Sequence, residues 1–136
     1  MGVSFDVKTL QLISLFEKKT RARVKDCILT IDKTIFILEQ GNLFKIIKNK
    51  GSIQKLENLF KFKIKLVEFN PDITIFVKNF VHPIRPESII EENGVVSIKG
   101  FDTKSKGLLI GRDSRNLDLL KTVVKKFFTI EDIKII

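Results

Sequence analysis

The fold is decided by the stretch Lys106-Gly107-Leu108-Leu109-Ile110-Gly111-Arg112-Asp113-Ser114-Arg115-Asn116-Leu117. A short apolar run ends at a glycine, a basic turn follows, and a new helical pattern begins at once. A glycine before a helix start lets the backbone approach a ligand closely, with amide groups free to bind phosphate. A similar but less regular stretch lies 64 positions earlier, Ile46-Ile47-Lys48-Asn49-Lys50-Gly51-Ser52-Ile53. We therefore predict two copies of one small nucleic-acid-binding unit.

The composition of this 136-residue chain favours one folded domain or two very small ones. Hydrophobic residues make up 43% of the chain and include 12 phenylalanines, which is enough for a packed core and argues against disorder. The formal net charge of +9 indicates an anionic partner, either nucleic acid or an acidic membrane surface. A lysine-rich surface that serves only solubility is the alternative explanation.

The sequence also indicates the cellular compartment of the protein. Cys27 is the only cysteine, so it forms no internal disulfide and indicates a reducing environment. Charged and polar residues interrupt the apolar runs near the amino terminus, which argues against a signal peptide. No apolar run approaches the roughly 18 residues of a membrane span. We therefore expect a cytoplasmic protein without a membrane partner.

Hydrophobic periodicity predicts the same order of elements twice, helix-strand-strand-helix-helix-strand. In the first half we expect a helix at 9–19, strands at 27–31 and 34–38 around a turn at Asp32-Lys33, a short helix at 43–47, a helix opening at Gly51-Ser52 and a strand at 62–66. In the second half we expect a helix capped by Asn70 with Pro71 at its first position, strands at 88–90 and 95–98 around Asn93-Gly94, a helix capped by Asp102 or Thr103, a helix at 116–128 and a strand at 133–136.

This order, with a glycine-bearing loop between the fourth and fifth elements, resembles a type II KH domain. Two such units in one short chain are similar to the archaeal NusA-like transcription termination and antitermination factors. The similarity runs through Leu15-Phe16-Glu17, Val24-Lys25-Asp26-Cys27, Lys65-Leu66-Val67-Glu68-Phe69, Phe76-Val77-Lys78-Asn79-Phe80, Gly107-Leu108-Leu109-Ile110-Gly111-Arg112 and Ile130-Glu131-Asp132-Ile133. It implies an α+β protein of two tandem type II KH domains, residues 1–69 and 70–136, each a three-stranded sheet with helices on one face.

The loops at 46–53 and 110–117 depart from the Ile-Gly-x-x-Gly pattern of the family that the chain resembles. With the copies set 64 positions apart, Ile47 and Lys50 stand at the two glycine positions of the first loop. The second loop keeps Gly111 but has Ser114 at the last position. Asp113 inside that loop would repel a phosphate. We therefore describe the first loop as degenerate and the second as partly retained.

The resemblance implies that each loop clamps an RNA backbone while an apolar groove accepts bases. The predicted RNA-binding residues are Lys48, Asn49, Lys50, Lys106, Gly111, Arg112, Ser114 and Arg115, and the predicted groove-lining residues are Ile46, Ile53, Ile110 and Leu117. Residues 43–65 hold seven lysines and one acidic residue, an excess that suits sequence-independent phosphate binding. The alternatives are that Gly111 only makes a tight turn, that the lysines only solubilise, and that the groove residues are core.

Catalysis finds little support. His82 has no cysteine or histidine companions at metal-ligand spacing, and Cys27 lies within a predicted strand as a small core residue. No Walker-type loop is present. We expect no enzyme, no metal, no cofactor and no small-molecule substrate.

The predicted function is RNA binding in transcription elongation or termination, by capture of single-stranded RNA on both loops, with RNA polymerase as a second candidate partner. The alternative is a degenerate KH pair that acts as a protein-interaction or ribosome-associated module.

Overall fold

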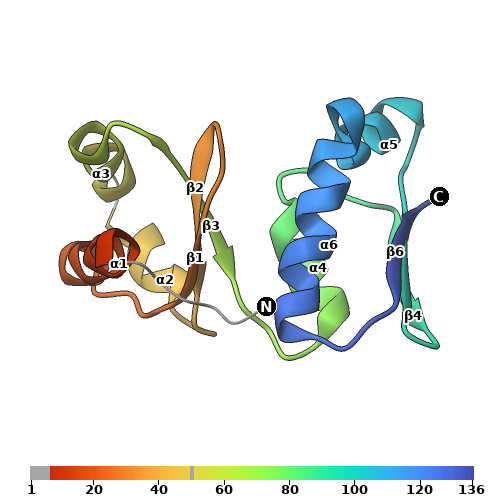
Figure 1. The fold of residues 1–136 in the computed structure, drawn as a ribbon, viewed down its shortest axis with the longest axis horizontal. Coiled ribbons are helices and arrows are strands. Elements are labelled where there is room, and N and C mark those ends of the chain that lie inside the picture. The colour runs from red at the N-terminus through yellow and green to blue at the C-terminus, as the bar shows by residue number, and fades with distance from the viewer. Residues whose placement is uncertain (1–6, 50) are drawn as a thin grey trace. The chain divides into compact units, whose positions relative to one another are not determined.

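The computed structural model describes residues 7–49 and 51–136, and the chain divides into two compact units, Met1–Phe69 and Asn70–Ile136. Each unit contains a three-stranded sheet, and Figure 1 shows the helices of each unit gathered on one face of its sheet. The architecture is α+β and is consistent with KH-like domains. The predicted element order occurs in both units, with one added 3-10 turn in the second.

In the first unit a hairpin and a later strand build the sheet. Its elements are α1 (Val7–Thr20), β1 (Val24–Leu29), β2 (Lys33–Leu38), α2 (Leu43–Ile47), α3 (Ser52–Phe60) and β3 (Lys63–Glu68). β2 lies at the centre, antiparallel to β1 and parallel to β3. The parallel pair requires a crossover, and α2 and α3 provide it.

The core of this unit joins α1, the sheet and the two crossover helices. The Phe16 and Phe36 rings stack with centroids 4.0 Å apart, which joins α1 to the central strand. The buried residues of this cluster are Phe16, Ala22, Cys27, Phe36, Leu38, Ile46 and Leu56. Burial raises the pKa of the Cys27 thiol to about 12, with a smaller contribution from the charge of Asp26.

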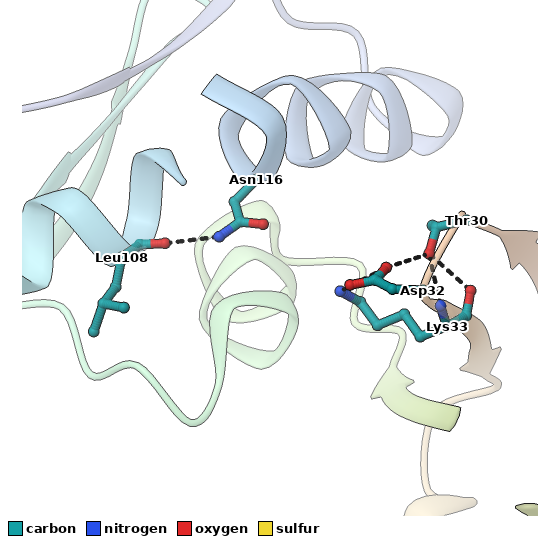
Figure 2. A network of polar contacts seen from close by, with 5 residues as sticks. All are labelled: Thr30, Asp32, Lys33, Leu108 and Asn116. Atoms are coloured by element: carbon teal, nitrogen blue, oxygen red, sulfur yellow. Dashed lines mark hydrogen bonds and ion pairs between the residues drawn. The ribbon is translucent and has the colours of Figure 1, made fainter. Parts of the chain in front are cut away.

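The hairpin turn differs slightly from the prediction. Thr30 Oγ1 donates to Asp32 Oδ1 at 3.0 Å and to the Lys33 carbonyl at 2.8 Å, as Figure 2 shows. Lys33 already belongs to β2, so Ile31 and Asp32 occupy the turn. Ile31, which we predicted in the strand, is 96% exposed. The threonine hydroxyl fixes this turn locally, and strand propensity alone does not reveal that bond.

The second unit repeats the plan. Its elements are α4 (Ile73–Val81), β4 (Ser88–Glu92), β5 (Val95–Lys99), α5 (Thr103–Ile110), η1 (Arg112–Ser114), α6 (Arg115–Phe127) and β6 (Asp132–Ile135). β5 is central, antiparallel to β4 and parallel to β6. Asn93 and Gly94 both have positive φ, 52° and 81°, which is the turn geometry that the Asn-Gly step predicts.

The helix caps of this unit resolve two predictions. Asp102 caps α5, because its carboxylate accepts the Ser105 N–H at 2.7 Å. Asp72, and not Asn70, caps α4, since its carboxylate accepts the Thr74 N–H at 3.0 Å. Asn70 instead accepts the Asp72 N–H at 2.8 Å and shapes the turn before the helix. Hydrogen bonds from the Thr74 hydroxyl and N–H hold the pKa of Asp72 below the ordinary carboxyl value, and the bond from the Ser105 N–H does the same for the pKa of Asp102.

Candidate nucleic-acid interface

The second loop joins the end of α5 to the start of α6. Gly111 follows α5 with φ 77° and ψ 168°, and its N–H donates to the Gly107 carbonyl at 2.8 Å. The single 3-10 turn η1 then leads into α6, and Ser114 N–H donates to the Gly111 carbonyl at 3.2 Å. Asp113 and Ser114 take left-handed backbone angles, with φ of 55° and 61°. Two non-glycine residues therefore occupy a region that favours glycine.

Gly111 makes room for a side chain of the next helix. A Cβ atom at this position would lie 2.7 Å from Asn116 Cγ and 2.9 Å from the Asn116 backbone nitrogen. The Asn116 amide donates to the Leu108 carbonyl at 2.9 Å (Figure 2), which satisfies a carbonyl near the end of α5. This bond ties the two helices together. Gly111 thus has a structural role in this turn.

The structure brings most predicted residues of the second loop to one exposed turn. Arg112 lies in η1 and Arg115 is the first residue of α6, and both are exposed. Ser114 is half-buried directly before α6 and makes no side-chain capping bond. Lys106 lies about one turn before the end of α5, where its Cγ would be 2.8 Å from a Cβ on Gly100. The stem of Lys106 covers Gly100 while the residue as a whole remains exposed.

The first loop joins α2 to α3 in the same way. Lys48 is the C-cap residue directly after α2, and its N–H donates to the Phe44 carbonyl at 3.1 Å. The backbone carbonyl of Asn49 accepts a hydrogen bond from the Ser52 N–H at 3.2 Å across the turn. Gly51 has φ 88° and directly precedes α3. Lys48 and Asn49 are exposed, and Lys50 falls outside the described residues.

The element boundaries correct the spacing of the two loops from 64 to 63 positions. α2 ends at Ile47 and α5 at Ile110, and α3 begins at Ser52 and α6 at Arg115. Gly51 and Ser114 are the left-handed residues before the second helix of each pair. Gly111 therefore matches Lys48, and Gly51 matches Ser114. Each loop therefore keeps one of the two glycines of the Ile-Gly-x-x-Gly pattern. The first loop keeps the last glycine, Gly51, and the second loop keeps the first glycine, Gly111. The 64-position spacing had identified only Gly111.

This shift changes the groove prediction. Ile46 is 4% exposed within the core cluster of the first unit, so it lies in the core and not in a groove. Ile53 packs against the same cluster, while Ile110 and Leu117 are half-buried. At the corrected spacing Ile110 matches Ile47, which is 63% exposed. The sequence comparison paired Ile110 with Ile46 instead, because helical phase alone does not fix the alignment of two loops to one residue.

The lysine excess of residues 43–65 does not form one uniform solvated face. Burial lowers the pKa of Lys65 to about 8, and the charge of Lys33 adds to the effect. Lys65 lies opposite Ile35 in the parallel ladder of β2 and β3. Lys45, Lys48 and Lys55 are exposed. Lys61 directly after α3 and Lys63 at the start of β3 are exposed as well, so the exposed cations of this stretch lie on both helices and on the third strand.

One aromatic residue lies outside the core beside this loop. Phe44 on α2 is 64% exposed, and the Lys48 Nζ atom lies 5.3 Å from the centroid of its ring. The 12 phenylalanines therefore do not all belong to the core. A five-residue helix has too few positions for its phase to show which face is solvated.

The described residues contain no group of three histidine, cysteine or acidic side chains that could hold a metal ion. Within the same part of the chain, no helix combines the length and the apolar character needed to cross a membrane.

Comparisons with known proteins cover nearly the whole chain. No family model matches. A probable transcription termination protein NusA of Halobacterium salinarum is 28% identical over 138 residues, which cover 99% of each chain. Proteins of the same name from Methanococcus vannielii and Thermoplasma acidophilum are each 26% identical, over 100% and 98% of this chain and 81% and 95% of their own.

A solved structure described as the crystal structure of APE1850 matches with a TM-score of 0.72 and 28% identity. The match covers 97% of this chain and 100% of that one. The similarity thus extends over both units, and the resemblance to the archaeal NusA-like factors is confirmed.

Proposed function

We propose that this chain, an archaeal NusA-like factor, captures single-stranded RNA on its two loops during transcription elongation or termination. Its relatives bear the name probable transcription termination protein, which supports a role related to transcription termination. The proposed units are type II KH domains, and the proposed mechanism is binding without catalysis. RNA polymerase is a further proposed partner.

The observation that carries this proposal is the repeated helix-loop-helix. In each unit, two helices joined by a loop form the crossover from the central strand to the third strand, which runs parallel to it. Each loop has one glycine in a left-handed or extended positive-φ conformation and exposes cations, Lys48 in the first and Arg112 with Arg115 in the second. Backbone amides at such turns bind phosphate, and lysine and arginine add affinity through counterion release.

The test is RNA binding by the full chain with the loop cations neutralised. Fluorescence anisotropy would measure the affinity of a labelled single strand of about 12 nucleotides, a length within the range that small binding folds cover. We expect the combined Lys48→Gln, Arg112→Gln and Arg115→Gln variant to bind more weakly. The slope of log affinity against log salt should fall by about 2, since each lost phosphate contact contributes roughly 0.7.

The matched control removes the same charge away from the loops. Lys78, Lys125 and Lys134 are exposed on α4, the last turn of α6 and β6. Their combined replacement by Gln should leave the salt slope close to that of the wild type. An equal loss of affinity in both triple variants would show that only net charge matters and would overturn the proposed role of the loops.

A second function, a protein-interaction or ribosome-associated module, is favoured by apolar side chains near the loops. Phe44 and Ile47 on α2 and Leu108 on α5 are exposed. Such residues commonly anchor protein contacts. If wild-type chain bound no single-stranded RNA at low salt but retained a protein partner through these residues, this alternative would replace RNA capture.

A further inference from the structure

A basic cleft lies behind the first loop, between the end of α1 and helix α2. It has a volume of about 410 Å³, is open to solvent and is lined by Lys19, Thr20, Arg21, Lys45, Lys48 and Asn49. Four of these residues are cations, and none of the described lining residues is acidic. The ion pairs found among the described residues involve none of these four side chains.

Buried and part-buried hydrogen bonds hold the two walls of the cleft in place. Asn42, at the start of α2, accepts the Arg23 N–H through its side-chain oxygen at 2.8 Å, which connects α2 to the segment after α1. Thr20 Oγ1 donates to the Phe16 carbonyl at 2.8 Å and accepts the Ala22 N–H at 3.1 Å. Phe16, Ala22 and Ile46 then share one core cluster. These bonds and this shared core hold the end of α1 and the start of α2, from which the cations project, in fixed positions.

The electrostatics of the cleft favour an anion. The carboxyl end of α1 contributes about half a negative charge, which four full positive charges outweigh. Arg21 takes a left-handed conformation, φ 63°, directly after the helix, where its N–H donates to the Glu17 carbonyl at 2.7 Å. Its guanidinium adds the planar donor group that suits phosphate oxygens. A cleft of this size that is open to solvent suits a passing chain better than an enclosed small molecule.

We propose that this cleft binds the phosphodiester backbone of the same single-stranded RNA, one or two nucleotides beyond the first loop. The ring of Phe44, exposed on the same short helix, then stacks on an adjacent base. Lys48 belongs to both regions, because it caps the end of α2 in the first loop, lines the cleft and lies over the Phe44 ring. This inference rests on the proposed function and adds a phosphate contact region that the loops alone do not supply.

The test uses a cleft variant that leaves both loops intact. Lys19→Gln and Lys45→Gln keep good helix formers, and Arg21→Asn places a residue that tolerates the left-handed conformation. We expect the triple variant to fold normally by circular dichroism and to bind a labelled oligouridine of about 12 nucleotides more weakly. Its salt slope should fall by about 2 between roughly 50 and 200 mM salt. The Lys78, Lys125 and Lys134 triple variant is the control for net charge.

A second variant tests the base contact without changing charge. Phe44→Leu should lower the affinity for oligouridine at least about fivefold and leave the salt slope unchanged, because stacking depends on the aromatic ring and not on ions. An abasic strand of equal length should show no difference between Phe44→Leu and wild type. Equal affinity of both proteins for oligouridine would remove Phe44 from the proposal.

The outcomes separate this inference from the function on which it rests. If wild type binds no single-stranded RNA, the proposed function fails and the cleft proposal fails with it. If wild type binds RNA and the cleft variant has the same affinity and salt slope, the cleft proposal alone is overturned. A polyglutamate chain that competes for the cleft as well as oligouridine of equal charge would overturn the RNA assignment in favour of an acidic protein segment.

Discussion

The two loops occupy the same place in their units, yet their glycines serve different purposes. Gly51 in the first loop has no atom within 4 Å of the position that a Cβ would take, so only its backbone conformation requires glycine. Gly111 in the second loop is surrounded by Asn116, whose side chain connects α5 and α6. The first loop is therefore open and lysine-rich, and the second is locked by its own packing.

The largest expected effect comes from filling the space at Gly111. Gly111→Ala should destabilise the protein by about 2–4 kcal/mol, because the cost of an extended positive-φ backbone that favours glycine adds to overlap with the Asn116 backbone nitrogen. Urea unfolding would measure this change. Gly107→Ala is the matched control, since Gly107 lies inside α5 with open space around it. The control should be neutral or stabilise by up to about 1 kcal/mol. Equal effects of the two variants would refute the packing role.

The same substitution in the first loop should cost less. Gly51→Ala should destabilise by about 1–2 kcal/mol, because the added methyl group meets no neighbour and only the left-handed backbone, φ 88°, opposes it. Gly51→Asn should recover part of that loss, since asparagine tolerates this conformation. Urea unfolding of the three proteins would measure both steps. A loss at Gly51 as large as that at Gly111 would contradict the contrast between an open and a packed loop.

The sequence predicts the order of the elements well because their boundaries carry local signals. Asn93-Gly94 forms the expected hairpin turn, and Asp102 supplies the expected cap. Helical phase also places Leu120, Val123 and Val124 in the core. These features depend on neighbouring residues along the chain, which a sequence shows directly.

The site was harder to predict because its details depend on contacts across the chain. The one-residue error in loop spacing made Ile46 a groove candidate, although it is core, and concealed Gly51 as a retained glycine. The bond from Asn116 to the Leu108 carbonyl crosses eight positions and leaves no periodic signal. The basic cleft combines the end of α1 with α2, which are far apart in sequence. Only the fold shows that these cations meet.

The titration of the Cys27 thiol reports on the packing of the first unit and not of the second. Cys27 shares the core cluster with Ile46 of α2, and burial raises its pKa from 9.0 to about 12. Between these values the unfolded chain loses the thiol proton and the folded chain retains it. Stability should therefore fall as the pH rises above 9, by about 1 kcal/mol at pH 10. Urea unfolding of wild type and Cys27→Ala at pH 8 and 10 would measure it. The difference between the two proteins should shrink at pH 10, and a constant difference would show that the thiol is not protected.

The smallest expected effect concerns the charge that distinguishes the second loop. Asp113 is exposed between Arg112 and Ser114, with φ 55°. Asp113→Asn keeps a residue that tolerates this conformation and removes the negative charge. At a separation of several ångströms in water, one charge pair is worth about 0.5–1 kcal/mol, so RNA affinity should rise roughly two- to fivefold at low salt. Anisotropy titrations at rising salt should show the gain disappear as screening increases.

Glu91→Gln, on the exposed hairpin of β4, changes net charge equally and should give a smaller gain. If the two gains were equal, Asp113 would act only through net charge, and the second loop would have no particular place along the RNA.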